Sequence, residues 1–252
     1  MHTQVKLFAE REGDLTGQDM NMNSNTTFKN FKFNWTVKDL YNGCLIASIA
    51  HAIMVAHYPM LSNEHSWDSS NYSIQDSCGI RGTITFYNGS CVGAFRDEKS
   101  TRIRTMHSFD PRAYLRNAPI DVQNMANNEA LQYLLENVNG IATPVISCAF
   151  WGNEEGVFSN DSFDDFIKNG GSIIESHLLD FESTISALTE DYEMSNPQVT
   201  LLKMIYFRMI ERPRKRVFLS KSEIDMIGCD DIEGLNESKA SFEQIGVAFD
   251  IK

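Results

Sequence analysis

Apolar and polar positions divide the chain into a polar start, one very apolar stretch and a series of shorter segments. Residues 1–30 offer little apolar surface to bury, so we expect a flexible polar arm there. Residues 40–58 form the most apolar stretch. Thr36 and Asp39 have the spacing of a capping box at its start, and Pro59 marks its end. Spanning a membrane takes about 20 apolar residues, so this shorter run predicts a buried helix instead.

The next part of the chain has the composition of β-strands. Residues 72–74, 83–87 and 91–95 are rich in β-branched and aromatic side chains. Asn88 and Gly89 separate the last two segments, and this dipeptide favours the positive φ angles of a type I′ turn. We therefore predict a β-hairpin here, within an antiparallel β-meander.

The second half of the chain predicts mainly helices with isolated strands. The predicted helices are 127–138, 163–169, 178–188, 199–210 and 221–227, and the predicted strands are 144–151, 217–219 and 245–251. A helix, then a meander, then helices with single strands is the order of an α+β fold. No Pro-, Ser- or Gly-rich linker divides residues 31–252, so we expect one α+β domain with a buried N-terminal helix and a mostly helical C-terminal half.

Charge and cysteine content narrow the class of protein. The 252 residues carry a formal net charge of −12, which disfavours nucleic acid as a partner because phosphates would meet a negative field. The same field would attract and orient a basic protein. Five cysteines at wide spacings, without a CxxC pair, are typical of free thiols in a reducing compartment. The start lacks the pattern of a signal peptide, so we expect a cytoplasmic protein with no membrane association.

The sharpest candidate for catalysis is Cys44, near the start of the apolar helix. If Asn42 rather than Thr36 is the N-cap, Cys44 lies in the first turn, where the helix dipole lowers the pKa of a thiol. This local arrangement resembles the placement of the cysteine in papain-like hydrolases, although no His-containing strand motif follows it. The partner base would be His107 or His177. The alternative is a buried cysteine in a core helix.

Metal and cofactor binding have little support. His51 and His57 are six residues apart and do not share a helix face. The chain has no HExxH, paired CxxC or EF-hand pattern, so we expect no metal and no cofactor, and we interpret His51 as a core histidine with satisfied hydrogen bonds. Carboxylates gather at 161–165 and 225–233. We interpret them as helix caps and solvated surface, with a metal-dependent hydrolase as the alternative.

Two kinds of surface residue are candidates for binding. The basic cluster comprises Arg212, Arg214, Lys215 and Arg216. It would form a patch for anions or nucleic acid if it joined a second basic region over 96–116, and the alternative is pairing with neighbouring acids. Trp67 and Tyr87 are candidate aromatic anchors of a protein interface.

Three functions stay open from the sequence. The first is a protein that binds another macromolecule and neutralises or regulates it, as immunity proteins and counter-defence inhibitors do. The second is a cysteine-dependent hydrolase or transferase with Cys44 as the nucleophile. The third is a module that binds anions or nucleic acid through residues 212–216. The net charge, the expected free thiols and the missing catalytic motifs favour the first.

Overall fold

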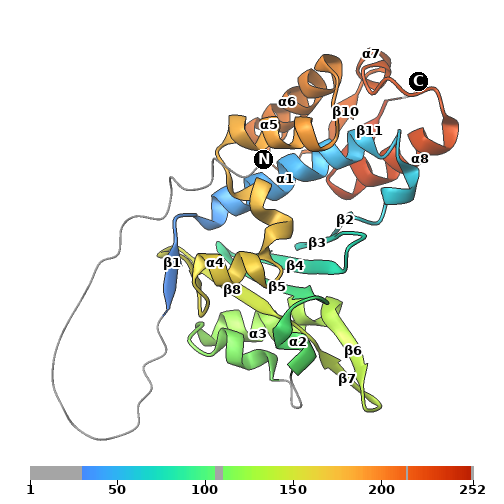
Figure 1. Cartoon of the computed structure of the whole chain (residues 1–252). Helices are drawn as coiled ribbons and strands as arrows, with labels where there is room; N and C mark the ends of the chain where they lie inside the picture. The colour runs from blue at the N-terminus through green and yellow to red at the C-terminus, as the bar shows by residue number, and fades with distance from the viewer. Residues whose placement is uncertain (1–29, 106–109, 214, 251–252) are drawn as a thin grey trace, which may run out of the picture.

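A seven-stranded antiparallel sheet lies at the centre of the structure, with helices on both faces (Figure 1). The computed structural model describes residues 30–105, 110–213 and 215–250. In sheet order the strands are β1 (Phe31–Phe33), β9 (Gly156–Ser159), β8 (Cys148–Asn153), β5 (Ser90–Asp97), β4 (Ile80–Tyr87), β3 (Asn71–Gln75) and β2 (His65–Asp68). Two smaller sheets pair β6 (Leu135–Val138) with β7 (Ile141–Pro144), antiparallel, and β10 (Val217–Leu219) with β11 (Val247–Phe249), parallel.

Helices supply most of the remaining structure, and the fold is α+β as predicted. The α-helices are α1 (Val37–Met54), α2 (Thr101–Thr105), α3 (Ile120–Asn128), α4 (Phe163–Lys168), α5 (Phe181–Asp191), α6 (Asn196–Glu211), α7 (Lys221–Asp225) and α8 (Ile232–Gln244). The 3₁₀ helices are η2 (Pro59–Leu61), η3 (Pro111–Leu115), η4 (Ala130–Leu134) and η5 (Gly171–Leu178).

The predicted buried helix is α1, which lies between the sheet and the C-terminal helices (Figure 1). Its N-cap is Thr36, whose hydroxyl accepts a hydrogen bond from the Asp39 amide (3.1 Å) while the Asp39 carboxylate accepts one from the Thr36 amide (3.0 Å). The alternative N-cap at Asn42 is therefore wrong. A helix that is apolar nearly all round must be packed against other elements on every side, and from Gly43 to Met54 every residue of α1 is buried.

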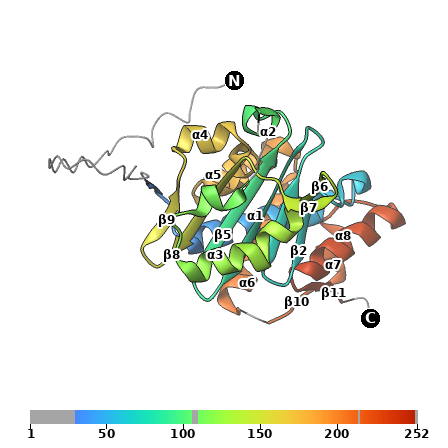
Figure 2. The same cartoon turned by 90° about the horizontal axis from the view of Figure 1, so that it is seen from below.

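Three apolar cores explain the layers. One face of the sheet packs on α1, α4 and η5 through side chains such as Tyr72 and Phe95. The opposite face packs on η3, α3 and η4 through Val92 and Trp151, and Figure 2 shows α3 crossing that face. The far side of α1 packs on α5, α6, α7, α8 and the β10–β11 pair. Thus α1 contributes to two of the three cores.

Most of the predicted local structure is confirmed. Strands β4 and β5 form the predicted hairpin, and Asn88 and Gly89 have φ angles of 48° and 79°. The predicted strands at β3, β8, β10 and β11 are present, and so are helices α4, α5 and α6. A capping box joins Ser220 and Glu223 at the start of α7.

The predicted helix over 127–138 is wrong. Helix α3 ends at Asn128, and the chain continues as η4 and then as strand β6. Leu131 and Leu134 are buried, but Leu135 and Val138 are exposed, so the four residues do not share one buried face. Residues 1–29 of the predicted arm lie outside the described residues. Among the helices of the described residues, none is long and apolar enough to cross a membrane.

Candidate functional site

Cys44 lies in the interior, well past the first turn of α1. Burial, and then the nearby Cys91, raise the pKa of the Cys44 thiol well above its usual value, so the thiol stays protonated at neutral pH. A side chain at Gly43 would collide with the backbone carbonyl of His177, which brings η5 against α1 at this point. His177 is therefore close to this part of α1, but both of its ring nitrogens have other partners.

The partners are the hydroxyls of Tyr72 and Ser176. Tyr72 belongs to a buried group that we call the histidine cluster: His51, His65, Tyr72 and His177. The Tyr72 hydroxyl lies 2.8 Å from His65 Nδ1 and 2.8 Å from His177 Nε2. The ring of His65 stacks on those of His51 and His177, with centroids 4.5 Å and 6.0 Å apart. The four side chains come from α1, β2, β3 and η5, so the cluster joins the helix layer to the sheet.

Burial keeps the three imidazoles neutral. It lowers the pKa of His177 to about 4, and lowers that of His51 to about 4 against a smaller opposite effect of the Ser62 backbone. Burial, followed by repulsion from its two neighbours, lowers the pKa of His65 well below its usual value. His51 is buried as expected, but it is only partly satisfied, since its Nε2 has no hydrogen-bond partner among the described residues.

The three imidazoles of the histidine cluster are groups that can take up protons, but they are buried away from solvent. All four side chains are buried. No group of three or more His, Cys, Asp or Glu side chains in the described parts of the chain is placed to hold a metal ion. The contacts of the histidine cluster join α1 and η5 to β2 and β3. His107, the other candidate base, lies outside the described residues.

Trp67 is partly exposed, and its side chain contacts the same region of α1 and β3. Its indole N–H donates to the Ser48 hydroxyl (2.8 Å), which donates in turn to the Cys44 carbonyl (2.7 Å). Its ring packs edge-on against Tyr41 and tilts against Tyr72. Tyr87 differs, because it lies at the end of β4 and is 64% exposed.

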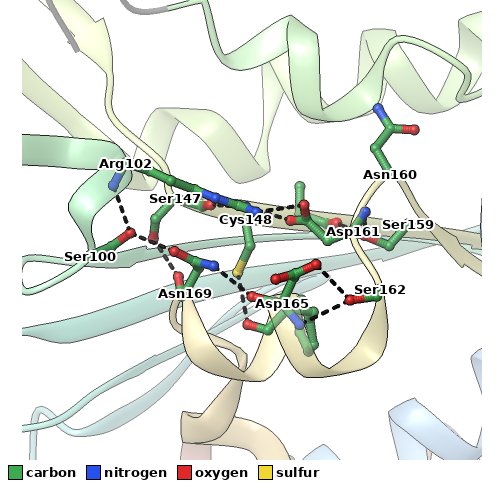
Figure 3. A network of polar contacts seen from close by, with 12 residues as sticks. Ser100, Arg102, Ser147, Cys148, Ser159, Asn160, Asp161, Ser162, Asp165 and Asn169 are labelled. Carbon is green, nitrogen blue, oxygen red and sulfur yellow. Dashed lines mark hydrogen bonds and ion pairs between the residues drawn. The ribbon is translucent and has the colours of Figure 1, made fainter. Parts of the chain in front are cut away.

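A second polar network lies beside the ends of β5, β8 and β9 (Figure 3). Arg102 on α2 donates two hydrogen bonds to the Asp161 carboxylate (2.7 and 2.9 Å) and one to the Ser147 carbonyl (2.8 Å). The buried Ser147 hydroxyl donates to the carbonyl of Asn169, whose side chain accepts from Ser100. These contacts fasten α2, β8, α4 and the segment after β9 to one another. Every group in them has a partner, which is typical of a structural network.

The carboxylate clusters form caps and ion pairs, as interpreted from the sequence. Ser162 is the N-cap of α4 and donates to Asp165 (2.7 Å). Asp231 is the N-cap of α8 and accepts from the Gly234 amide (2.8 Å). Asp161 pairs with Arg102, as described above.

The described members of the basic cluster lie on the surface. Arg212, Lys215 and Arg216 are exposed, and Arg216 lies 4.0 Å from Glu243. Arg214 lies outside the described residues. In the second region, Arg102 and Arg112 form ion pairs with Asp161 and Asp110.

One structural feature absent from the sequence predictions is the β-hairpin β6–β7. Asn139 and Gly140 form its turn, with φ angles of 53° and 85°. Val138 and Ile141 face each other across the turn and are both exposed, Ile141 by 68%. At the base, Glu136 forms ion pairs with Arg81 and Arg96 of the large sheet. The hairpin thus projects from the large sheet, and the ion pairs of Glu136 attach its base to that sheet (Figure 1).

Comparison with known proteins found no matching family model, no similar curated protein and no similar solved structure.

Proposed function

We propose that this protein binds another protein through the β6–β7 hairpin. The observation that carries the proposal is the hairpin itself. Within the described residues it forms a two-stranded sheet of its own, and its tip exposes an apolar pair, Val138 and Ile141. An exposed strand edge is a template for pairing with a strand of another chain.

The anchor at the base supports this proposal. An isolated two-stranded hairpin is marginally stable in water, so this one depends on its attachment. Glu136 contacts both Arg81 and Arg96, and the Val145 amide donates to the Leu134 carbonyl (2.9 Å), which closes the base. A hairpin held in its bound shape loses less conformational entropy on association than a mobile loop would.

The partner we propose has an exposed strand edge beside an apolar pocket, and a net positive charge. The strand edge would continue the β6–β7 ladder, and the pocket would cover Ile141. The charge follows from the net −12 of this chain, which speeds association with a basic protein. Binding would neutralise or regulate the partner, in the manner of immunity or counter-defence proteins.

The proposal is tested by placing a photoreactive amino acid at position 141 and, as a control, at position 60. Met60 is 77% exposed in η2, away from the hairpin. We expect one dominant cross-linked protein at position 141 and no such product at position 60, in the cells that make this protein. Identical products at both positions would contradict the proposal.

A substitution then links the cross-link to affinity. Ile141→Asp should abolish co-purification of the same partner, because it places a charge in the apolar contact, while Met60→Asp should leave it unchanged. Both side chains are exposed, so circular dichroism should show both variants folded. Equal recovery of the partner with the two variants would remove the hairpin from the interface.

A further inference from the structure

A pocket with a mixed polar and apolar lining opens on the face of the sheet that lies below η4. Its volume is about 260 Å³, and it is lined by Asn63, Ser66, Ser73, Ile74, Gln75, Arg81, Gly82, Tyr133 and Leu134. The strand register explains the polar part of its walls. Ser66 pairs with Ser73, and Gln75 pairs with Arg81, and paired residues in neighbouring strands point to the same face.

Two guanidinium groups lie side by side at this place. Arg81 lines the pocket, and its cross-strand partner is Arg96 on β5. Both form ion pairs with the same carboxylate, Glu136, and Arg96 also lies 3.6 Å from Glu98, which is mostly exposed. One partly buried carboxylate is therefore shared between two positive charges.

The hydrogen bonds of these two arginines are incomplete. The Nε atoms of Arg81 and Arg96 are buried and have no hydrogen-bond partner among the described residues, although the Arg81 side chain as a whole is 35% exposed. Leaving a buried donor unpaired is costly, so such groups in folded proteins normally have an acceptor, either from the protein, from water or from a ligand. Arg81 is the one of the two that lines the pocket, so its Nε–H is the donor there that an added oxygen acceptor would pair with.

We propose that the pocket binds a small organic anion through Arg81, with a carboxylate or phosphate group as the recognised part. A guanidinium binds such oxyanions through paired N–H donors. Ser66 on β2 and Ser73 on β3 add hydroxyl groups to the lining, and the Ser73 hydroxyl also lies 3.1 Å from that of Thr83. A volume of about 260 Å³ limits the ligand to a small molecule, below the usual range for drug-sized ligands.

The test titrates the full-length protein with inorganic phosphate and, separately, with succinate, at constant ionic strength. Chloride replaces the anion in the reference samples. We expect at least one of the two anions to raise the Tm in a saturable way and to shift the NMR resonance of the Arg81 Nε–H group. If neither anion moves the Tm or the resonance beyond the effect of chloride, water satisfies the site and the proposal is wrong.

Variants separate the pocket from general charge effects. Arg81→Lys keeps the charge but loses Nε and the planar donor fork, so binding should weaken about tenfold or more. Ser73→Ala changes the opposite wall and should also weaken binding. Arg112→Lys, at an exposed pair with Asp110, is the matched control and should bind as the unchanged protein does. Equal anion affinity in all three variants would overturn the proposal, and Arg81→Lys and Ser73→Ala are both checked for folding by circular dichroism.

Discussion

A single hydroxyl proton links two buried imidazoles in the histidine cluster. Tyr72 has one O–H to donate and lies at hydrogen-bond distance from nitrogens of both His65 and His177. Only one of these contacts can use that proton, so in the other contact the histidine nitrogen must donate. The hydroxyl therefore couples the tautomers of the two rings. An extra proton on either ring would create a positive charge that is buried away from water.

The lowered pKa values of the buried histidines predict that the protein loses stability in mild acid. The folded pKa of His51 is about 4 and the unfolded value is 6.5, so the unfolded state binds the proton first as the pH falls. The contribution to stability is intact above pH 6.5 and declines as the pH falls from 6.5 to about 4. At pH 4.5 the loss should be about 2–3 kcal/mol from this residue alone. His177 should contribute similarly, because its folded pKa is also about 4.

Urea unfolding at pH 7 and pH 4.5 measures the loss. Carboxylates contribute to any acid effect, so the comparison uses His51→Gln, which removes one titrating ring. The difference in unfolding free energy between the two pH values should be smaller in His51→Gln by about 2–3 kcal/mol. An unchanged difference would show that His51 is charged, or exposed to solvent, in the folded state.

The environment of Cys44 predicts slow alkylation. Its thiol is fully buried, whereas Cys78 is exposed. Iodoacetamide reacts with the thiolate, so at neutral pH it should modify Cys78 and leave Cys44 unmodified until the protein unfolds. Peptide mass spectrometry at successive times distinguishes the two sites. Modification of Cys44 as fast as Cys78 would restore the hypothesis of a cysteine-dependent hydrolase or transferase.

At the scale of elements, the contact between α1 and η5 depends on one missing side chain. A Cβ at position 43 would lie 1.9 Å from the His177 carbonyl oxygen, which belongs to the backbone and cannot rotate away. Gly43→Ala should therefore destabilise the protein by about 3 kcal/mol or more, despite the better helix propensity of alanine. Asn42→Ala, one residue earlier, is the control and should change stability by less than about 0.5 kcal/mol. Chemical unfolding of both variants checks this, and similar values would mean that η5 does not pack here.

Helices and turns were predictable from the sequence where a short local motif determines where they begin or reverse. The Thr36–Asp39 capping box and the Asn88-Gly89 turn are such signals, and both give the expected structure. Asn139-Gly140 is the same kind of signal and would have found the β6–β7 hairpin. The predicted helix over 127–138 rested on the helical spacing of residues such as Leu131 and Leu134, and spacing alone does not show which residues a neighbouring layer will cover.

The candidate sites were less predictable, because their members are distant in the sequence. The histidine cluster joins residues of α1, β2, β3 and η5, and no local motif marks it. Arg81 and Arg96 meet only because β4 and β5 pair in one particular register. The sequence offered His177 as one of two possible partners of Cys44, but nothing in the sequence showed that Cys44 and His177 would both be buried.

At the scale of the whole molecule, the sheet and the C-terminal helices share one helix. Leu40 and Cys44 of α1 belong to the core beneath the sheet, while residues further along, such as Ile49 and Ile53, belong to the core of the C-terminal helices. Neither core is complete without α1. Strand pairs of the large sheet such as β1–β9 and β5–β8 also join segments that are far apart in the sequence, and folding is slower when such contacts dominate.

The shared helix limits how this chain can be cut or rearranged. A fragment that ended at Leu178 would lack α5, α6 and α8. The apolar side of α1 that packs on these helices would then be exposed to solvent. Such a fragment should aggregate rather than fold independently. Expressing the two parts of the chain separately, or inserting a tag between them, should therefore prevent both parts from folding.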